Sequence, residues 1–189
     1  MIRQLIFSIL MLVFATVHAQ DIDKLYKEGK ALYDAKQYTE AIAKLRPAAE
    51  RGHKKAQYRM GRAYDKGNGV AEDNAKAFYW YAKSAAQDYA KAQYQVGRCY
   101  KKGKGTDKDL KKAVLYFTRA ARQGNADAQL ALGKCYLKGQ GVKADRAKAK
   151  SWCLKAIKNE KGGKDVLAEL RQEAADGDKD AESILNLIK

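Results

Sequence analysis

The sequence predicts an all-α fold, a right-handed solenoid of stacked antiparallel helix hairpins. Small residues recur every 36 residues, a period that fits one helix hairpin per unit. Within each period the apolar residues follow helical spacing, and no stretch alternates apolar and polar residues as a strand would. Each hairpin then buries its apolar face against its neighbours. The clearest columns are Ala56, Ala92 and Ala128; Gly61, Gly97 and Gly133; and Gly67, Gly103 and Gly139.

Residues 1–19 have the pattern of a secretory signal peptide. Arg3 supplies the positive end, and the apolar run of residues 5–15 is too short to span a bilayer. Small residues up to Ala19 form a cleavage signal before Gln20. We therefore expect export to the periplasm or to the outside of the cell, with an uncleaved membrane anchor as the alternative.

Residues 20–52 predict an N-terminal capping hairpin similar to a tetratricopeptide unit. Gly29 and Ala41 occupy the positions expected of its two helices, but their spacing is four residues shorter than in the later hairpins. The longer glycine loop is therefore absent here. Pro47 lies late in the second helix, where a missing N–H predicts a kink or an early stop.

Residues 53–158 comprise three repeats. In the first repeat, Gly61 lacks a side chain in mid-helix, which predicts a close approach by another helix. Gly67 then favours a left-handed cap that ends the first helix, and Asp73 or Asn74 offers an N-cap oxygen to the second. The packed face of that second helix is Ala77, Tyr81, Ser84 and Ala85.

These repeats resemble the Sel1-like repeat family, a relative of the tetratricopeptide repeats. The shared pattern is Ala-Gln-x3-Gly-x2-Tyr-x2-Gly-x-Gly, followed by Asp, Lys-Ala and an aromatic pair, and it recurs at residues 92–121 and 128–157. The resemblance implies a solenoid whose first helices line a binding groove. In the first repeat the matching residues are Ala56, Gln57, Gly61, Tyr64, Gly67, Gly69, Asp73, Lys76, Ala77, Trp80 and Tyr81.

Residues 159–189 predict two C-terminal capping helices after the Gly162-Gly163 interruption. One apolar stripe is Val166, Leu170 and Ala174, and the other is Ala181, Ile184, Leu185 and Ile188.

The formal net charge is +16, and loss of Arg3 with the signal peptide lowers it to +15. Such a basic surface attracts acidic proteins, anionic glycans or envelope polymers. Nucleic acid is a poor candidate for an exported chain, so we expect no specific nucleic-acid binding. Apart from residues 1–19, no segment is apolar enough to cross a membrane.

Three cysteines, Cys99, Cys135 and Cys153, are an odd number, so at least one has no partner within a monomer. Cys99 and Cys135 occupy the same repeat column, which separates them by about 8–10 Å, too far for a disulfide. We expect all three to be small buried hydrophobic residues. A Cys135–Cys153 bridge is the better alternative if one exists.

Catalytic chemistry has little support. His53 is the only histidine after residue 19, no nucleophile has a recognisable partner, and we expect no metal, no cofactor and no enzyme activity. We interpret His53 as a surface turn residue. Some cysteine-rich secreted relatives of this family are described as binding or hydrolysing β-lactams, but they carry a cysteine pair in each repeat, which this chain lacks.

A stripe of tyrosines beside a stripe of basic residues is the best candidate for a site. Each tyrosine precedes its base by four residues, so both lie on one helix face. We expect an exported protein-interaction scaffold with these anchors, the alternative being tyrosines that only seal helix packing beside solvated bases. A binder of anionic envelope polymer or glycan is the second function considered. The candidate residues are Tyr26, Lys30, Tyr58, Arg62, Tyr94, Arg98 and Lys134.

Overall fold

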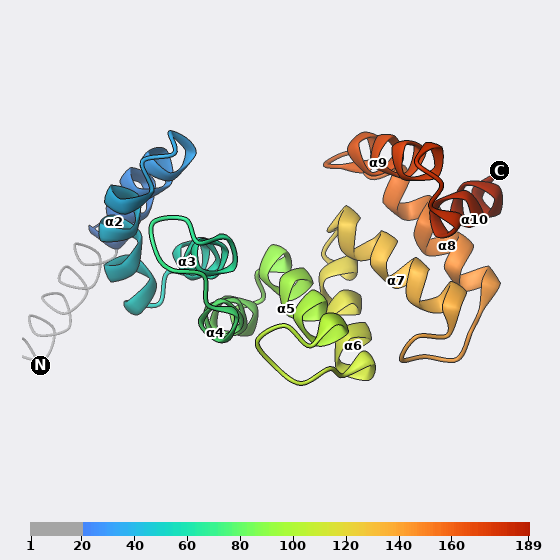
Figure 1. Ribbon diagram of the computed structural model, residues 1–189, viewed down its shortest axis with the longest axis horizontal. Coiled ribbons are helices and arrows are strands. Elements are labelled where there is room, and N and C mark those ends of the chain that lie inside the picture. The colour runs from blue at the N-terminus through green and yellow to red at the C-terminus, as the bar shows by residue number, and fades with distance from the viewer. Residues whose placement is uncertain (1–20) are drawn as a thin grey trace, which may run out of the picture. The chain divides into compact units, whose positions relative to one another are not determined.

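A computed structural model describes residues 21–189, and every regular element in that range is a helix (Figure 1). Consecutive helices pack as hairpins, which confirms the predicted all-α solenoid class. The signal peptide predicted for residues 1–19 lies outside the described residues. The chain divides into two compact units, unit 1 up to Ser84 and unit 2 from Ala85 to Lys189, and each is described by itself.

Unit 1 contains helical residues 21–34, α2 (Tyr38–Glu50), α3 (Lys54–Lys66) and most of α4 (Asn74–Ala86). Helix α2 continues through Pro47 to Glu50, so the early stop expected at Pro47 does not occur. Only the last turn follows the proline, and there the carbonyl of Pro47 still accepts a hydrogen bond from the N–H of Arg51 at 3.2 Å.

Unit 2 is built from three successive hairpins. Helix α5 packs on α6, α6 on α7 and α7 on α8, while α9 and α10 pack on each other and on α8. The bounds are α5 (Ala90–Lys102), α6 (Leu110–Arg122), α7 (Ala126–Lys138), α8 (Arg146–Ile157), α9 (Gly163–Ala175) and α10 (Lys179–Ile188).

The mid-helix glycines mark the closest contacts between the two helices of a hairpin, as predicted. A Cβ atom on Gly97 would lie 2.6 Å from the ring of Phe117. A Cβ on Gly61 would lie 2.5 Å from the ring of Tyr81, and one on Gly133 would lie 2.5 Å from the sulfur of Cys153. These separations are far below van der Waals contact, so only glycine lets the second helix approach this closely.

The helix ends follow the predicted capping chemistry. Gly103 has φ of +70° and its N–H returns to the carbonyl of Cys99, which ends α5 in a left-handed cap. Asp109 then accepts a hydrogen bond from the N–H of Lys112 at 2.9 Å and starts α6. In the first repeat the cap is Asp73, which accepts from Lys76 N–H at 2.9 Å, so Asp73 rather than Asn74 is the N-cap.

The three cysteines are all buried, as expected, and none of them forms a disulfide within residues 21–189. Burial raises the pKa of Cys135, and it raises the pKa of Cys153 to about 11, although the nearby charge of Lys134 opposes that shift. Both groups therefore stay protonated near neutral pH and serve as small apolar side chains. A low-pKa, exposed thiolate of the kind that catalysis requires is absent from residues 21–189.

The last hairpin covers α7 and α8 with its own apolar stripes. The predicted core positions Val166, Leu170, Ala181 and Ile184 are each buried. They join Ala126, Cys153 and Ala156 in one hydrophobic cluster. Ion pairs fasten the same hairpin to α7 at its surface, one from Lys134 to Glu173 and one from Lys138 to Asp180.

Candidate functional site

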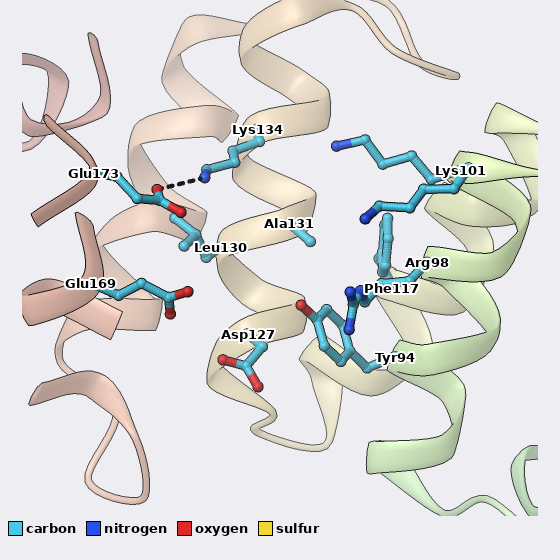
Figure 2. A pocket seen from close by; sticks show the side chains of 11 residues that line it. Tyr94, Arg98, Lys101, Phe117, Asp127, Leu130, Ala131, Lys134, Glu169 and Glu173 are labelled. Carbon is cyan, nitrogen blue, oxygen red and sulfur yellow. Dashed lines mark hydrogen bonds and ion pairs between the residues drawn. The ribbon is translucent and has the colours of Figure 1, made fainter. Parts of the chain in front are cut away.

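Unit 2 contains a pocket of about 200 Å³ that lies where α5, α7 and α9 come together (Figure 2). These are the first helices of successive hairpins, which is where the resemblance placed a groove. Phe117 of α6 also reaches the pocket. The lining residues are Tyr94, Arg98, Lys101, Lys102, Phe117, Asp127, Leu130, Ala131, Lys134, Glu169 and Glu173.

The α5 side of the pocket carries an aromatic ring beneath an arginine. The Tyr94 ring packs against the buried Phe117 ring with centroids 5.9 Å apart. Because Arg98 follows Tyr94 by one helical turn, its guanidinium carbon lies 5.8 Å from the Tyr94 ring centroid. Arg98 is exposed, donates to the amide oxygen of Gln95 at 3.2 Å, and has no carboxylate partner among residues 21–189.

The α9 side and the start of α7 carry carboxylates. Glu173 of α9 pairs with Lys134 of α7, with 3.4 Å between Nζ and Oε2. Glu169, one turn earlier on α9, and Asp127, in the first turn of α7, have no basic partner within the described part of the chain. Figure 2 shows Glu169 across the pocket from Arg98 and Lys101, whereas Asp127 lies between the two sides, at the start of α7 and nearer to Tyr94.

The middle of the pocket is apolar. Leu130 and Ala131 of α7 lie between the carboxylates of α9 and the basic residues of α5 (Figure 2). Leu130 stands in the repeat column that holds Tyr58 and Tyr94 in the earlier repeats. Leucine is smaller than tyrosine, and here it forms part of the apolar lining of the pocket.

Three of the sequence-predicted residues line this pocket: Tyr94, Arg98 and Lys134. Lys134 is already held by Glu173, and its side chain is only 23% exposed. Of the three, Arg98 is therefore the cation best placed to meet a partner.

The other predicted residues lie in unit 1. Tyr58 packs against Tyr81 with centroids 5.8 Å apart, and Arg62 is exposed. Tyr26 stacks on His53 at 4.3 Å, and Lys30 forms an ion pair with Asp34 at 2.8 Å. These tyrosines do seal packing, and the binding roles of Tyr26, Lys30, Tyr58 and Arg62 stay predictions.

His53 lies in the turn before α3, as predicted, but its side chain is mostly covered and has a structural role. Its Nδ1 accepts a hydrogen bond from the N–H of Ala56 at 3.1 Å, which makes it the N-cap of α3. Its Nε2 lies 3.2 Å from the carboxylate of Asp23, and its side chain is only 15% exposed. Burial lowers the pKa of His53, although Asp23 opposes that shift. Tyr26 stacks on the ring and covers part of it, a contact that the sequence pattern did not reveal.

Sequence reasoning missed the acidic residues of the pocket. Asp127 stands in a repeat column that holds lysine in the other two units, Lys55 and Lys91. That departure from the repeat is a signal that could have identified it. Glu169 carries no such signal because α9 lies outside the 36-residue columns.

No cluster of histidine, cysteine or carboxylate side chains that could hold a metal ion occurs within residues 21–189. Over the same range, none of the helices has the length and apolar character needed to cross a bilayer.

Two solved structures share this fold. One is a Sel1 repeat protein from Oxalobacter formigenes, with a TM-score of 0.70 and 33% identity over 77% of this chain and 57% of that protein. The other is a protective antigen of uropathogenic Escherichia coli strains displaying an SLR fold, with a TM-score of 0.73 and 30% identity over 89% of this chain. The present chain spans 36% of that antigen.

A curated relative is a negative regulator of exopolysaccharide production from Rhizobium meliloti. It is 36% identical over 63 residues, which are 33% of this chain and 24% of the regulator. Repeats of this kind generally serve as protein–protein interaction modules and are typically non-enzymatic. The Sel1 repeat itself matches residues 54–89, 90–125 and 126–160, more than half of the chain. The chain therefore belongs to the Sel1 repeat family.

Proposed function

We propose that unit 2 binds a peptide segment of a protein partner in the pocket between α5, α7 and α9, and that an acidic side chain of the segment pairs with Arg98. The observation that carries this proposal is the position of Arg98: it lies over the Tyr94 ring beside the apolar middle of the pocket and pairs with no carboxylate among residues 21–189. A guanidinium held over a ring is oriented before binding, so it loses little freedom when it forms a two-pronged pair with a carboxylate.

The pocket volume supports recognition rather than catalysis. Sites for drug-sized ligands are typically about 300–1,000 Å³, whereas this pocket is about 200 Å³. An apolar cavity of roughly 150 Å³ accepts one benzene molecule. The pocket thus suits one side chain of a partner, and the buried, protonated thiols near α7 supply no nucleophile for a β-lactam-hydrolysing activity.

A binder of anionic envelope polymer or glycan is the second candidate, and the net charge of +16 favours it. The two candidates differ in their response to salt. Polymer binding by diffuse charge weakens steeply as ionic strength rises, whereas a peptide anchored by Tyr94 and Arg98 loses less.

Export to the periplasm or beyond is part of the proposal, since it rests on the sequence pattern of residues 1–19 alone. Mass spectrometry of the protein isolated from its native host tests this point. A mature chain beginning at Gln20 supports export, and an intact Met1 start on a protein retained in the cytoplasm contradicts it.

The binding site is tested on a partner captured by crosslinking in the native compartment. We expect Arg98→Ala to weaken the partner's affinity by about 2 kcal/mol, the loss typical of a central anchor. Arg122→Ala is a matched control because Arg122 is an exposed arginine on α6 outside the pocket. Equal small losses at both arginines, with unchanged helicity, would favour diffuse charge and the polymer. No loss at Arg98 would remove this pocket from the proposal.

A further inference from the structure

Apart from the Lys134–Glu173 ion pair, the charged residues that line the pocket of unit 2 are not paired with one another. On the α5 side, Arg98, Lys101 and Lys102 have no carboxylate partner among residues 21–189. On the other side, Glu169 and Asp127 have no basic partner in the same range. Figure 2 shows the apolar side chains of Leu130 and Ala131 between Glu169 and the bases of α5, and Asp127 one turn earlier on α7, near Tyr94. The result is a pocket with a basic side, an apolar middle and an acidic side.

The helix packing keeps the two sides apart. Lys134, the base nearest to α9, is used by Glu173 and so cannot neutralise Glu169 as well. Lys138 pairs with Asp180 of α10, which fastens the same hairpin further along α7. Other residues therefore hold the α9–α10 hairpin in place, and the carboxylate of Glu169 faces the pocket without a basic partner among residues 21–189.

This charge arrangement disfavours several occupants. A uniformly anionic polymer gains at Arg98 but meets like charges at Asp127 and Glu169, a juxtaposition that opposes binding. A uniformly basic segment is repelled by Arg98, Lys101 and Lys102 of α5. A second copy of this chain would bring a further net charge of +16, so long-range repulsion opposes self-association here.

The geometry points to a peptide segment in which one apolar residue lies between an acidic and a basic residue. The acidic side chain lies over α5 and pairs with Arg98, and the apolar side chain enters the pocket over Leu130 and Ala131. The basic side chain meets Glu169 across the apolar middle of the pocket. This inference rests on the proposed peptide-binding function and deepens it, because it defines the charge order that the partner must carry.

The test selects binders from a display library of random short peptides on the immobilised protein. The unaltered protein is expected to enrich sequences that contain an acidic, an apolar and a basic residue in one consistent order. Arg98→Glu is expected to remove the acidic preference, and Glu169→Lys to remove the basic one, each by about tenfold or more in enrichment. The double variant Arg98→Glu/Glu169→Lys exchanges the two sides, so it is expected to enrich the reversed charge order.

Two control variants accompany the selection. Arg122→Glu changes the charge of an exposed arginine on α6 by the same amount, and Glu182→Lys does the same for an exposed glutamate on α10. Neither residue lines this pocket, so neither is expected to alter the selected charge order. If the control variants alter the selected charge order as much as the Arg98 or Glu169 variants do, then net charge and not the pocket determines which peptides are selected.

The outcomes separate this inference from the proposed function. Peptides that depend on Arg98 but not on Glu169 would overturn the acid–apolar–base order and leave peptide binding in place. Peptides that depend on neither residue, or no enrichment at all, would overturn both. Reversal of the charge order by the double variant is the result that establishes the inference, because a structural defect weakens selection but does not invert it.

Discussion

Unit 1 and unit 2 repeat the same aromatic packing but differ in the charges around it. Tyr58 lies against Tyr81 in unit 1 with centroids 5.8 Å apart, and Tyr94 lies against Phe117 in unit 2 at 5.9 Å. The base one turn later is exposed in both, as Arg62 and as Arg98. The repeat period therefore determines the ring contact and the position of the base.

The two units differ in whether their carboxylates are paired with basic residues. In unit 1 the carboxylate of Asp34 is held by Lys30 and by Arg59, each at 2.8 Å. In unit 2, Asp127 and Glu169 have no basic partner within the described residues and face a pocket. Binding chemistry in this molecule thus arises at residues that depart from the repeat, while residues that obey the repeat maintain packing.

The largest effect is expected in the reactivity of the three cysteines, all of which lie in unit 2. Burial raises the pKa of Cys153 from the ordinary 9.0 to about 11, which lowers its thiolate population about 100-fold, and steric protection slows its reaction further. We expect native Cys153 to be labelled at least that much more slowly than in denaturant, where all three cysteines should react. Rapid native labelling of all three would show that unit 2 opens readily or that their burial is wrong.

Close approach of the helices is tested in both units by adding a side chain at a mid-helix glycine. Gly97→Leu forces an isobutyl group into the Phe117 ring, and we expect a loss of about 3 kcal/mol in unfolding free energy from overpacking. Gly61→Leu should cost a similar amount because Tyr81 lies equally near. Urea denaturation measures both, with the exposed Lys91→Leu on α5 as the control. A loss of unfolding free energy for only one of the two variants would show that Gly61 and Gly97 are not structurally equivalent.

The comparison of Arg98 with Arg62 tests whether binding belongs to unit 2. Once a partner is captured, Arg98→Ala is expected to cost about 2 kcal/mol of binding free energy. Arg62→Ala should cost under about 0.5 kcal/mol, as is usual for an exposed charge outside a pocket. Isothermal titration or surface plasmon resonance on variants of unchanged helicity gives the measurement. Equal losses would mean that unit 1 contributes an anchor as well.

We expect acid to lower the stability of unit 1 because a titratable side chain caps one of its helices. The corresponding cap in unit 2 does not titrate. His53 caps α3 in unit 1, whereas Asn125 caps α7 in unit 2. Since burial lowers the folded pKa of His53 below 6.5, the unfolded chain binds the proton more readily. The stabilisation is therefore complete above pH 6.5 and is lost as pH falls from there towards the folded pKa.

Denaturant midpoints between about pH 7.5 and about pH 5 test this dependence, a window that stays above the titration of most carboxylates. His53→Asn keeps an N-cap acceptor without the titration, so its midpoint should vary less with pH. We expect the effect to be on the order of 1 kcal/mol, the value of a typical N-cap. If His53→Asn loses as much stability on acidification as the unaltered protein does, then groups other than His53 cause the pH dependence.

Part of the candidate site could be predicted from the sequence. Tyr94 and Arg98 follow from helical spacing and the repeat period, both of which are local properties of the chain. Asp127 was detectable as an aspartate in a lysine column, although a first-turn carboxylate is also a common helix stabiliser. Its role in the pocket depends on what faces it, and that residue, Arg98, belongs to a different hairpin.

The sequence by itself determined the hairpin period, the capping residues Gly103 and Asp109, and the glycine contacts, because each depends on interactions within one hairpin or with its neighbour. Only the tertiary structure decided which charges are paired. Lys134 meets Glu173, 39 residues later in the chain, on a hairpin that does not follow the repeat. The physical reason is that a charge is neutralised by whatever packs beside it, and α9 packs beside α7 through its apolar stripe without regard to the period.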